Sequence, residues 1–300
     1  MSRRITQLIT PIICSCLLFA AGSYDVLNLP QDARSLALNN SISAYDTPLM
    51  QNNPASMSMH SNVMSYSYLY LPANIHMGEL HHISKKSKWV KAANISLLNY
   101  GTIIDSETEE KSHAFEFLVK RGYKRELKNI VSIGISGGYL FSSITGFNSQ
   151  LLFSNVGVRS RLFRKKIGIG ISLENIGMHL KSYTDVKEPI PTFFRTAIYY
   201  KLIYIPLIIN SEIVRYFNNN IYYCSSGLEF ISKRRLSFRI GFSSKKRDYI
   251  INNFTSDIIA GISGGVGFQF KNVILDVGFM NMGSAGCIMG FSITKKRKQL

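Results

Sequence analysis

The sequence predicts an all-β protein, a transmembrane antiparallel β-barrel of about 14 strands with an N-terminal plug segment. Apolar residues alternate with small or polar ones along most of the chain, in segments of about ten residues, the length that a tilted strand needs to cross a bilayer. An apolar leader precedes these segments, and no later apolar run is long enough to predict a membrane-spanning helix. Together these observations favour a barrel that is apolar outside and polar inside.

The stretch 166–177 (KIGIGISLENIG) shows the alternation most clearly. Its apolar positions are Ile167, Ile169, Ile171 and Leu173, and between them lie Gly168, Gly170, Ser172 and Glu174. A period of two places these two sets on opposite faces of a strand. Because a row of glycines beside a glutamate suits a crowded polar interior, we assign the apolar face to lipid.

The first residues are typical of a secretory signal peptide, which we place at 1–22. Arg3 and Arg4 form its positive start, and residues 5–21 are largely apolar. Small residues before Tyr24 allow cleavage after Gly22 or Ser23. Export followed by barrel strands predicts the outer membrane of a Gram-negative-type bacterium.

Residues 23–62 do not alternate, and we interpret them as a plug or hatch inside or under the barrel. Asp32 is a suitable N-cap for a short helix that continues through Leu38. Asn53 and Pro54 predict a turn or a helix start.

The barrel is predicted to occupy 63–294, followed by a basic tail at 295–300. Its first strand begins at Val63, where Tyr66, Tyr68 and Tyr70 share one face, as tyrosines do at a membrane–water interface. The other strands are expected at 74–83, 90–98, 114–120, 130–139, 151–161, 166–177, 192–200, 207–214, 221–230, 236–242, 258–270, 273–279 and 287–293.

The connections between these strands differ in length and charge, and the difference predicts an orientation. Short basic connections at 85–88, 121–128, 164–166 and 233–235 alternate with longer ones at 100–112, 178–190 and 243–255. Outer-membrane barrels have short periplasmic turns and longer outer loops. The basic turns, the plug and the tail are therefore expected on the periplasmic side.

Charged residues of both signs fall on the inward face of the predicted strands. They are Glu116, Arg159, Glu174, Arg195, Glu212, Glu229, Arg239 and Asp276. Charges are tolerated inside a barrel when they are paired or hydrated, and a ring of one sign would indicate an ion filter. The mixture favours a filled interior held by a salt-bridged charge network, with a substrate path as the alternative.

The formal net charge of +17 has several explanations. Solvated turns explain it most simply, and an anionic partner such as lipopolysaccharide is the alternative beside the outer-membrane lipid itself. The chain lacks zinc-finger spacing and RNA-binding signatures, so nucleic acid is not an expected partner. It also lacks metal-ligand spacings, a phosphate loop and a nucleophile elbow, so we expect no cofactor, no metal and no enzymatic activity.

Several short motifs resemble the PorV/PorQ family of outer-membrane barrels. Its N-terminal signature is similar to Leu29-Pro30, Ala33-Arg34 and Asn53-Pro54-Ala55. Asn175 and Gly177, within 174–177, resemble the PorQ branch, as do 99–102, 180–183 and 188–191. The pair 227–229 and 238–242 is similar to the family as well.

The resemblance implies a FadL-like barrel of fourteen strands with an N-terminal plug, and a role in type IX protein secretion. The chain would then hold protein partners of a secretion and surface-attachment complex. Tyr183, Pro189 and Pro191 would make a rigid outer loop suited to partner binding. The alternative is a FadL-like channel for hydrophobic small molecules, and a porin is a third reading that the crowded lumen disfavours.

Overall fold

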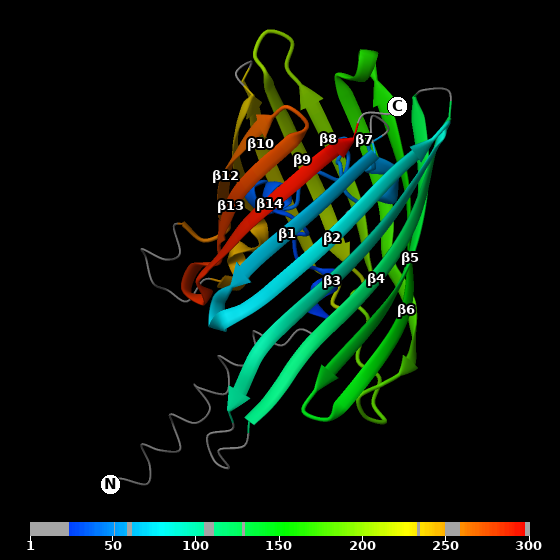
Figure 1. Cartoon of the computed structure of the whole chain (residues 1–300), viewed down its shortest axis with the longest axis vertical. Coiled ribbons are helices and arrows are strands. Elements are labelled where there is room, and N and C mark those ends of the chain that lie inside the picture. The colour runs from blue at the N-terminus through cyan, green and yellow to red at the C-terminus, as the bar shows by residue number, and fades with distance from the viewer. Residues whose placement is uncertain are drawn as a thin grey trace.

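The computed structural model describes residues 24–50, 52–58, 62–104, 111–127, 130–232, 235–249 and 259–297. Fourteen antiparallel strands form one closed barrel, in which each strand pairs with its neighbours in sequence and β1 closes on β14 (Figure 1). This confirms the predicted fold class. No described helix is long and apolar enough to cross a membrane.

The strands are β1 (Asn62–Leu71), β2 (Ile75–Lys86), β3 (Trp89–Ile104), β4 (Lys111–Leu127), β5 (Val131–Ile144), β6 (Phe147–Leu162), β7 (Ile167–Lys181), β8 (Phe193–Lys201), β9 (Leu207–Tyr216), β10 (Tyr222–Ile231), β11 (Leu236–Ser243), β12 (Ile262–Phe270), β13 (Val273–Asn281) and β14 (Cys287–Arg297). Short helical turns are η1 (Asp25–Leu27), η2 (Pro54–Ser56), η3 (Pro72–Asn74), η4 (Phe163–Lys165), η5 (Ser244–Tyr249) and η6 (Gly283–Ala285), and the α-helix α2 spans Ala33–Ala37.

The alternation in the sequence becomes an alternation of burial along each strand. In β4 the exposed residues Phe115, Phe117 and Val119 face outward, and Glu116 and Leu118 face inward. Every Asp or Glu on the described strands faces the interior: Glu79, Glu116, Glu126, Glu174, Glu212, Glu229 and Asp276. The outer surface therefore carries no carboxylate on these strands, which is the distribution that a lipid-facing wall requires.

Two ends of the barrel can be distinguished. The turn end holds the connections β2–β3, β4–β5, β6–β7, β8–β9, β10–β11 and β12–β13, together with the start of β1 and the end of β14. The loop end holds the other connections, including 182–192 between β7 and β8. The predicted basic turn at 121–128 is largely wrong, because residues 121–127 continue β4 by pairing with both β3 and β5. Lys295 and Lys296 of the predicted tail likewise pair with β1, so β14 runs to Arg297.

The described N-terminal segment, 24–50 and 52–58, lies within the ring of strands and is mostly buried (Figure 1). Asp32 caps α2 by accepting a hydrogen bond from Ser35 N, as predicted, and Asn53 caps η2. The segment lies directly on glycines of the wall: a Cβ on Gly278 would lie 2.3 Å from Ala33 O. The predicted signal peptide 1–22 lies outside the described residues, as do Ser23 and 59–61, so the predicted bounds 23–62 for a plug stay a prediction.

Candidate functional site

The inner wall near the loop end is apolar. Eight buried side chains of β1–β6 and β14 form this apolar layer: Leu69, Met77, Leu98, Leu118, Leu140, Leu151, Phe153 and Ile288. Tyr24, Val26 and Leu36 of the N-terminal segment pack against it, as does Tyr183 of the 182–192 loop. The wall and the N-terminal segment therefore share one apolar core near the loop end.

A polar layer follows between the apolar layer and the turn end, and its first ion-pair group joins α2 to the wall. Arg34 Nε and Nη2 donate to Glu229 at 2.9 and 2.7 Å. Arg239 Nε donates to the same carboxylate at 2.8 Å, and Arg239 Nη1 donates to Asp276 at 2.6 Å. A bidentate arginine fixes both position and angle, so α2 is held rigidly at this point.

The second ion-pair group links β7, β8 and β9. Arg195 Nε donates to Glu174 Oε1 at 3.0 Å, and Arg195 Nη1 donates to Glu212. Ser43 Oγ of the N-terminal segment donates to Glu212 Oε2 at 2.8 Å. The wall and the segment therefore share this group as well.

The third ion-pair group lies closer to the turn end. Arg159 Nη1 is 2.7 Å from Asp46 Oδ1 and donates to Ser56 O at 3.3 Å. Arg161 pairs with Glu126, and Lys124 Nζ donates to Met57 O. Beyond α2, the N-terminal segment is thus tied to β6 through Asp46 and Ser56, and to β4 through Met57.

Glu116 is different, because it lies beside the apolar layer without a described ion-pair partner. Its Oε2 accepts from Val26 N at 2.9 Å, and its Oε1 accepts from Tyr100 Oη at 3.2 Å. Tyr100 Oη also lies 3.3 Å from Asp25 Oδ2. Burial raises the pKa of Asp25 to about 6, so its carboxyl group takes up a proton more readily than it does in water.

The wall has a break in its hydrogen-bond ladder between β7 and β8. β7 pairs with β8 only as far as Glu174, and Asn175 takes a left-handed conformation (φ 57°) at a bulge opposite β6. The 182–192 loop contacts β7 at Asn175 and at His179: Asn175 Nδ2 donates to Pro191 O at 3.0 Å, Thr192 Oγ1 donates to Asn175 O at 2.9 Å, and His179 Nε2 donates to Glu188 O at 2.8 Å. Side chains and a loop, rather than a strand, close the wall here.

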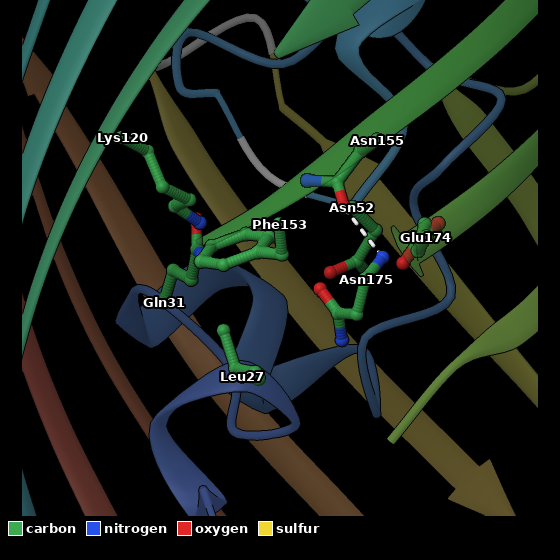
Figure 2. A pocket seen from close by; sticks show the side chains of 8 residues that line it. All are labelled: Leu27, Gln31, Asn52, Lys120, Phe153, Asn155, Glu174 and Asn175. Carbon is green, nitrogen blue, oxygen red and sulfur yellow. Dashed lines mark hydrogen bonds between the residues drawn. The ribbon is translucent and has the colours of Figure 1, made fainter. Parts of the chain in front are cut away.

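A small cavity of about 10 Å³ lies beside this bulge, with room for about one water molecule (Figure 2). Leu27 and Phe153 border it from the apolar layer, and Glu174 and Asn175 border it from the break. Lys120 and Asn155 contribute polar atoms, and Asn175 N donates to Asn155 Oδ1 at 2.7 Å. The cavity therefore joins the apolar layer to the break, but it is too small for an organic molecule in this state.

All eight side chains of the charge network predicted from the sequence are buried in the interior. Seven of them fall into the three ion-pair groups, and Glu116 does not. Further charged residues of the interior were not predicted from the sequence: Asp46, Glu79, Lys120, Lys124, Glu126 and Arg161. The strand parity of Arg161, two residues beyond Arg159, could have revealed it, whereas Asp46 lies in a segment without periodicity.

The motif residues occupy the N-terminal segment and the bulge. Leu29 packs against the apolar layer, Ala33, Asn53, Pro54 and Ala55 are buried against the wall, and Pro30 is buried nearby. Gly177 lies in β7 beyond the bulge, where a Cβ would lie 2.4 Å from Leu152 O. Among the three residues assigned to partner binding, Tyr183 donates to Ser142 and stacks on Tyr24, Pro191 is buried, and Pro189 is exposed. Two of the three therefore contact the barrel itself.

No protein-family profile matches the sequence, and no curated protein matches it. Solved structures do share its fold. TodX, a toluene transporter from P. putida, superposes with a TM-score of 0.65 at 9% identity, over 90% of this chain and 99% of that one. TbuX, a toluene transporter from Ralstonia pickettii, gives 0.63 at 11% identity, over 89% and 98%. A FadL homologue from Pseudomonas aeruginosa gives 0.56 at 9% identity, over 89% and 99%.

Two of these neighbours are toluene transporters and the third is a FadL homologue, none is a component of a secretion complex by its description, and the barrel is of the outer-membrane type that they share. The identification with the PorV/PorQ family is therefore wrong, and so is the type IX secretion role that it implied. The motifs misled because each spans two to five residues, and similar caps and bulges serve any barrel with an internal N-terminal segment. No three His, Cys, Asp or Glu side chains in the described part of the chain are placed to hold a metal ion.

Proposed function

We propose that this protein is a non-enzymatic channel for hydrophobic small molecules in the outer membrane of a Gram-negative-type bacterium. The observation that carries the proposal is the apolar layer, which extends from the loop end to the β7–β8 break. The fold shared with two toluene transporters supports this class of substrate. The turn end would face the periplasm, because its connections are short.

The interior described above is a closed state, so a ligand must displace part of the N-terminal segment. Tyr24 and Val26 are suited to this, because they are held mainly by apolar contacts and by Glu116. A one-ring hydrocarbon buries about as much area as a phenylalanine side chain, so its transfer from water is worth about 4 kcal/mol. This gain offsets the exposure of the displaced residues.

The break beside Asn175 provides a way out through the wall. No hydrogen bonds between β7 and β8 have to be broken there, because the described pairing of the two strands ends at Glu174 and the 182–192 loop contacts β7 beyond it. A ligand that leaves sideways at this point enters lipid instead of water, which favours an apolar substrate.

Uptake of radiolabelled toluene by cells that lack other hydrocarbon channels tests the proposal. Leu118→Asn places an amide in the apolar layer and should lower uptake at least tenfold. Val90→Asn makes a similar change in a buried cluster at the turn end of β3, away from the pathway, and should leave uptake unchanged in assembled protein. Wild-type uptake no higher than that of vector-only cells, or equal loss in both variants, would contradict the channel.

A further inference from the structure

The outward face of β3 and β4 carries three basic side chains near the turn end. Lys91 lies directly opposite Tyr123, Arg121 lies opposite Ala93, and Arg125 lies opposite Trp89. All three basic side chains are exposed on the outer wall. Lys91 is thus the diagonal neighbour of both arginines, at about 7–8 Å between backbones, within reach of long side chains.

Among the described residues, these three cations have no carboxylate beside them. The described Asp and Glu residues of β1–β6 are Glu79, Glu116 and Glu126, and all three face the interior. Arg125 lies over the Trp89 ring, with Cζ 5.2 Å from the ring centroid, which compensates only one of the charges. Three like charges this close repel one another unless an anion from outside the chain lies between them.

The surroundings place this cluster at the border of the apolar band. On β4 the residues beyond Arg121, toward the loop end, are Val119, Phe117 and Phe115, all exposed. Trp89 and Tyr123 are the aromatic residues that typically mark the level of lipid headgroups. Ala93 and Gly137 flank Arg121 on the neighbouring strands, so no bulky side chain covers its guanidinium group.

We infer that Lys91, Arg121 and Arg125 bind the phosphate of an anionic glycerophospholipid, with its acyl chains along the apolar residues of β3 and β4. Arginine recognises a phosphate through two parallel hydrogen bonds, and lysine adds a point charge. Because the cluster lies at the turn end, the bound lipid would come from the membrane leaflet on the turn-end side. This inference rests on the membrane location in the proposed function, but not on transport.

Native mass spectrometry of the purified barrel with equal amounts of phosphatidylglycerol and phosphatidylcholine tests the site. We expect wild type to retain phosphatidylglycerol preferentially, and we expect the triple variant K91Q/R121Q/R125Q to lose the preference. Each charge removed should lower the ratio of bound phosphatidylglycerol to bound phosphatidylcholine about fivefold. The matched control K165Q/K201Q/K271Q removes three exposed charges elsewhere at the turn end, two in connections and one at the end of β8, and should retain the preference.

The variant R121K/R125K keeps the charge and loses the planar fork, so it should fall between wild type and the triple variant. If the triple variant does not assemble, as judged by heat-modifiable migration, the single variants K91Q, R121Q and R125Q give the same readout. An unchanged ratio in the triple variant, or in all three single variants, would overturn the site.

Two competitors distinguish the source of the phosphate. Free inorganic phosphate at millimolar concentration should not displace the lipid, and purified lipid A should compete less well than phosphatidylglycerol. Displacement by either would overturn the glycerophospholipid assignment. Wild-type protein that fractionates away from membranes would overturn the membrane location, whereas failed toluene uptake with an intact lipid preference would overturn only the channel.

Discussion

The N-terminal segment is held in two different ways in the two layers of the interior. In the polar layer Arg34, Ser43 and Asp46 join three separate ion-pair groups on the wall. In the apolar layer Tyr24 and Val26 rely on apolar contacts and on a few hydrogen bonds. A buried ion pair that loses one partner leaves an uncompensated charge, whereas an apolar contact can be exchanged for a ligand of similar area.

This difference assigns two roles to the two layers: the polar layer stabilises the N-terminal segment, and the apolar layer allows its first residues to be displaced. The polar layer fixes most of the segment in place, and the apolar layer gives its first residues an alternative occupant to exchange with. The channel proposed above would open by local displacement near the loop end, without expulsion of the whole segment. The four predictions below test this division, from the largest expected effect to the smallest.

Breaking the anchor in the polar layer should have the largest effect. Arg34→Met leaves Glu229 with Arg239 as its remaining partner and should cost about 3–5 kcal/mol in unfolding free energy. Chemical unfolding in detergent measures the loss, and limited proteolysis reports release of the segment. Arg34→Lys keeps the charge but not the bidentate geometry, and should cost less. A loss below 1 kcal/mol for Arg34→Met would show that α2 is not anchored by this pair.

A steric change under the segment should have the next largest effect. A Cβ on Gly134 would lie 2.4 Å from Pro54 C, so Gly134→Ala should cost about 1–3 kcal/mol by pushing η2 from the wall. Gly78→Ala is the matched control, because no atom lies within 4 Å of its added Cβ. Equal unfolding free energies for the two variants would mean that η2 does not lie against β5 as described.

The packing of the first described residues, 24–26, against the apolar layer should weaken as the pH rises. The pKa of Asp25 is raised by burial from 3.8 to about 6, so the seated state favours the protonated acid. The contribution of protonated Asp25 to the stability of this packed state is fully present below about pH 4. It is lost as the pH rises through about 6. Tyr100 Oη lies within hydrogen-bond distance of both the Asp25 and the Glu116 carboxyl groups, and Lys245 acts on Asp25 electrostatically.

Protease cleavage near Tyr24 should therefore increase between pH 5 and pH 7. Asp25→Asn removes this titration and should flatten the profile, with the cleavage rate measured against that of an exposed loop as an internal control. If the cleavage rate of the wild type depends on pH no more than that of Asp25→Asn, then Asp25 does not control the release of the first residues.

Loosening the 182–192 loop should have the smallest effect. Asn175→Gly keeps the left-handed backbone but removes the hydrogen bond to Pro191 O, worth about 1 kcal/mol. Toluene uptake should rise by a few fold, because the loop covers the exit. Asn220→Gly, at another left-handed asparagine in the β9–β10 connection, should leave uptake unchanged. An equal change of uptake in both variants would show that the break between β7 and β8 is not part of the transport path.

The fold was largely predictable because a barrel strand is a local pattern. Ile169 and Ile171 face outward and Arg195 and Glu229 face inward, as their parity requires. Strand ends were less predictable: 121–127 looked like a basic turn, yet it pairs along its length with β3 and β5. Hydrogen bonding between neighbours decides where a strand ends, and composition does not record it.

The candidate site was predictable only in part. The sequence alone determined which wall residues face the interior, because side-chain direction in a strand follows from the period of two. Only the tertiary structure decided that Glu229 meets Arg34, that Glu116 has no described arginine beside it, and that inward apolar side chains from seven strands gather near the loop end. These contacts join residues far apart in the chain, and they depend on barrel shear and on the path of an aperiodic segment, which no local pattern encodes.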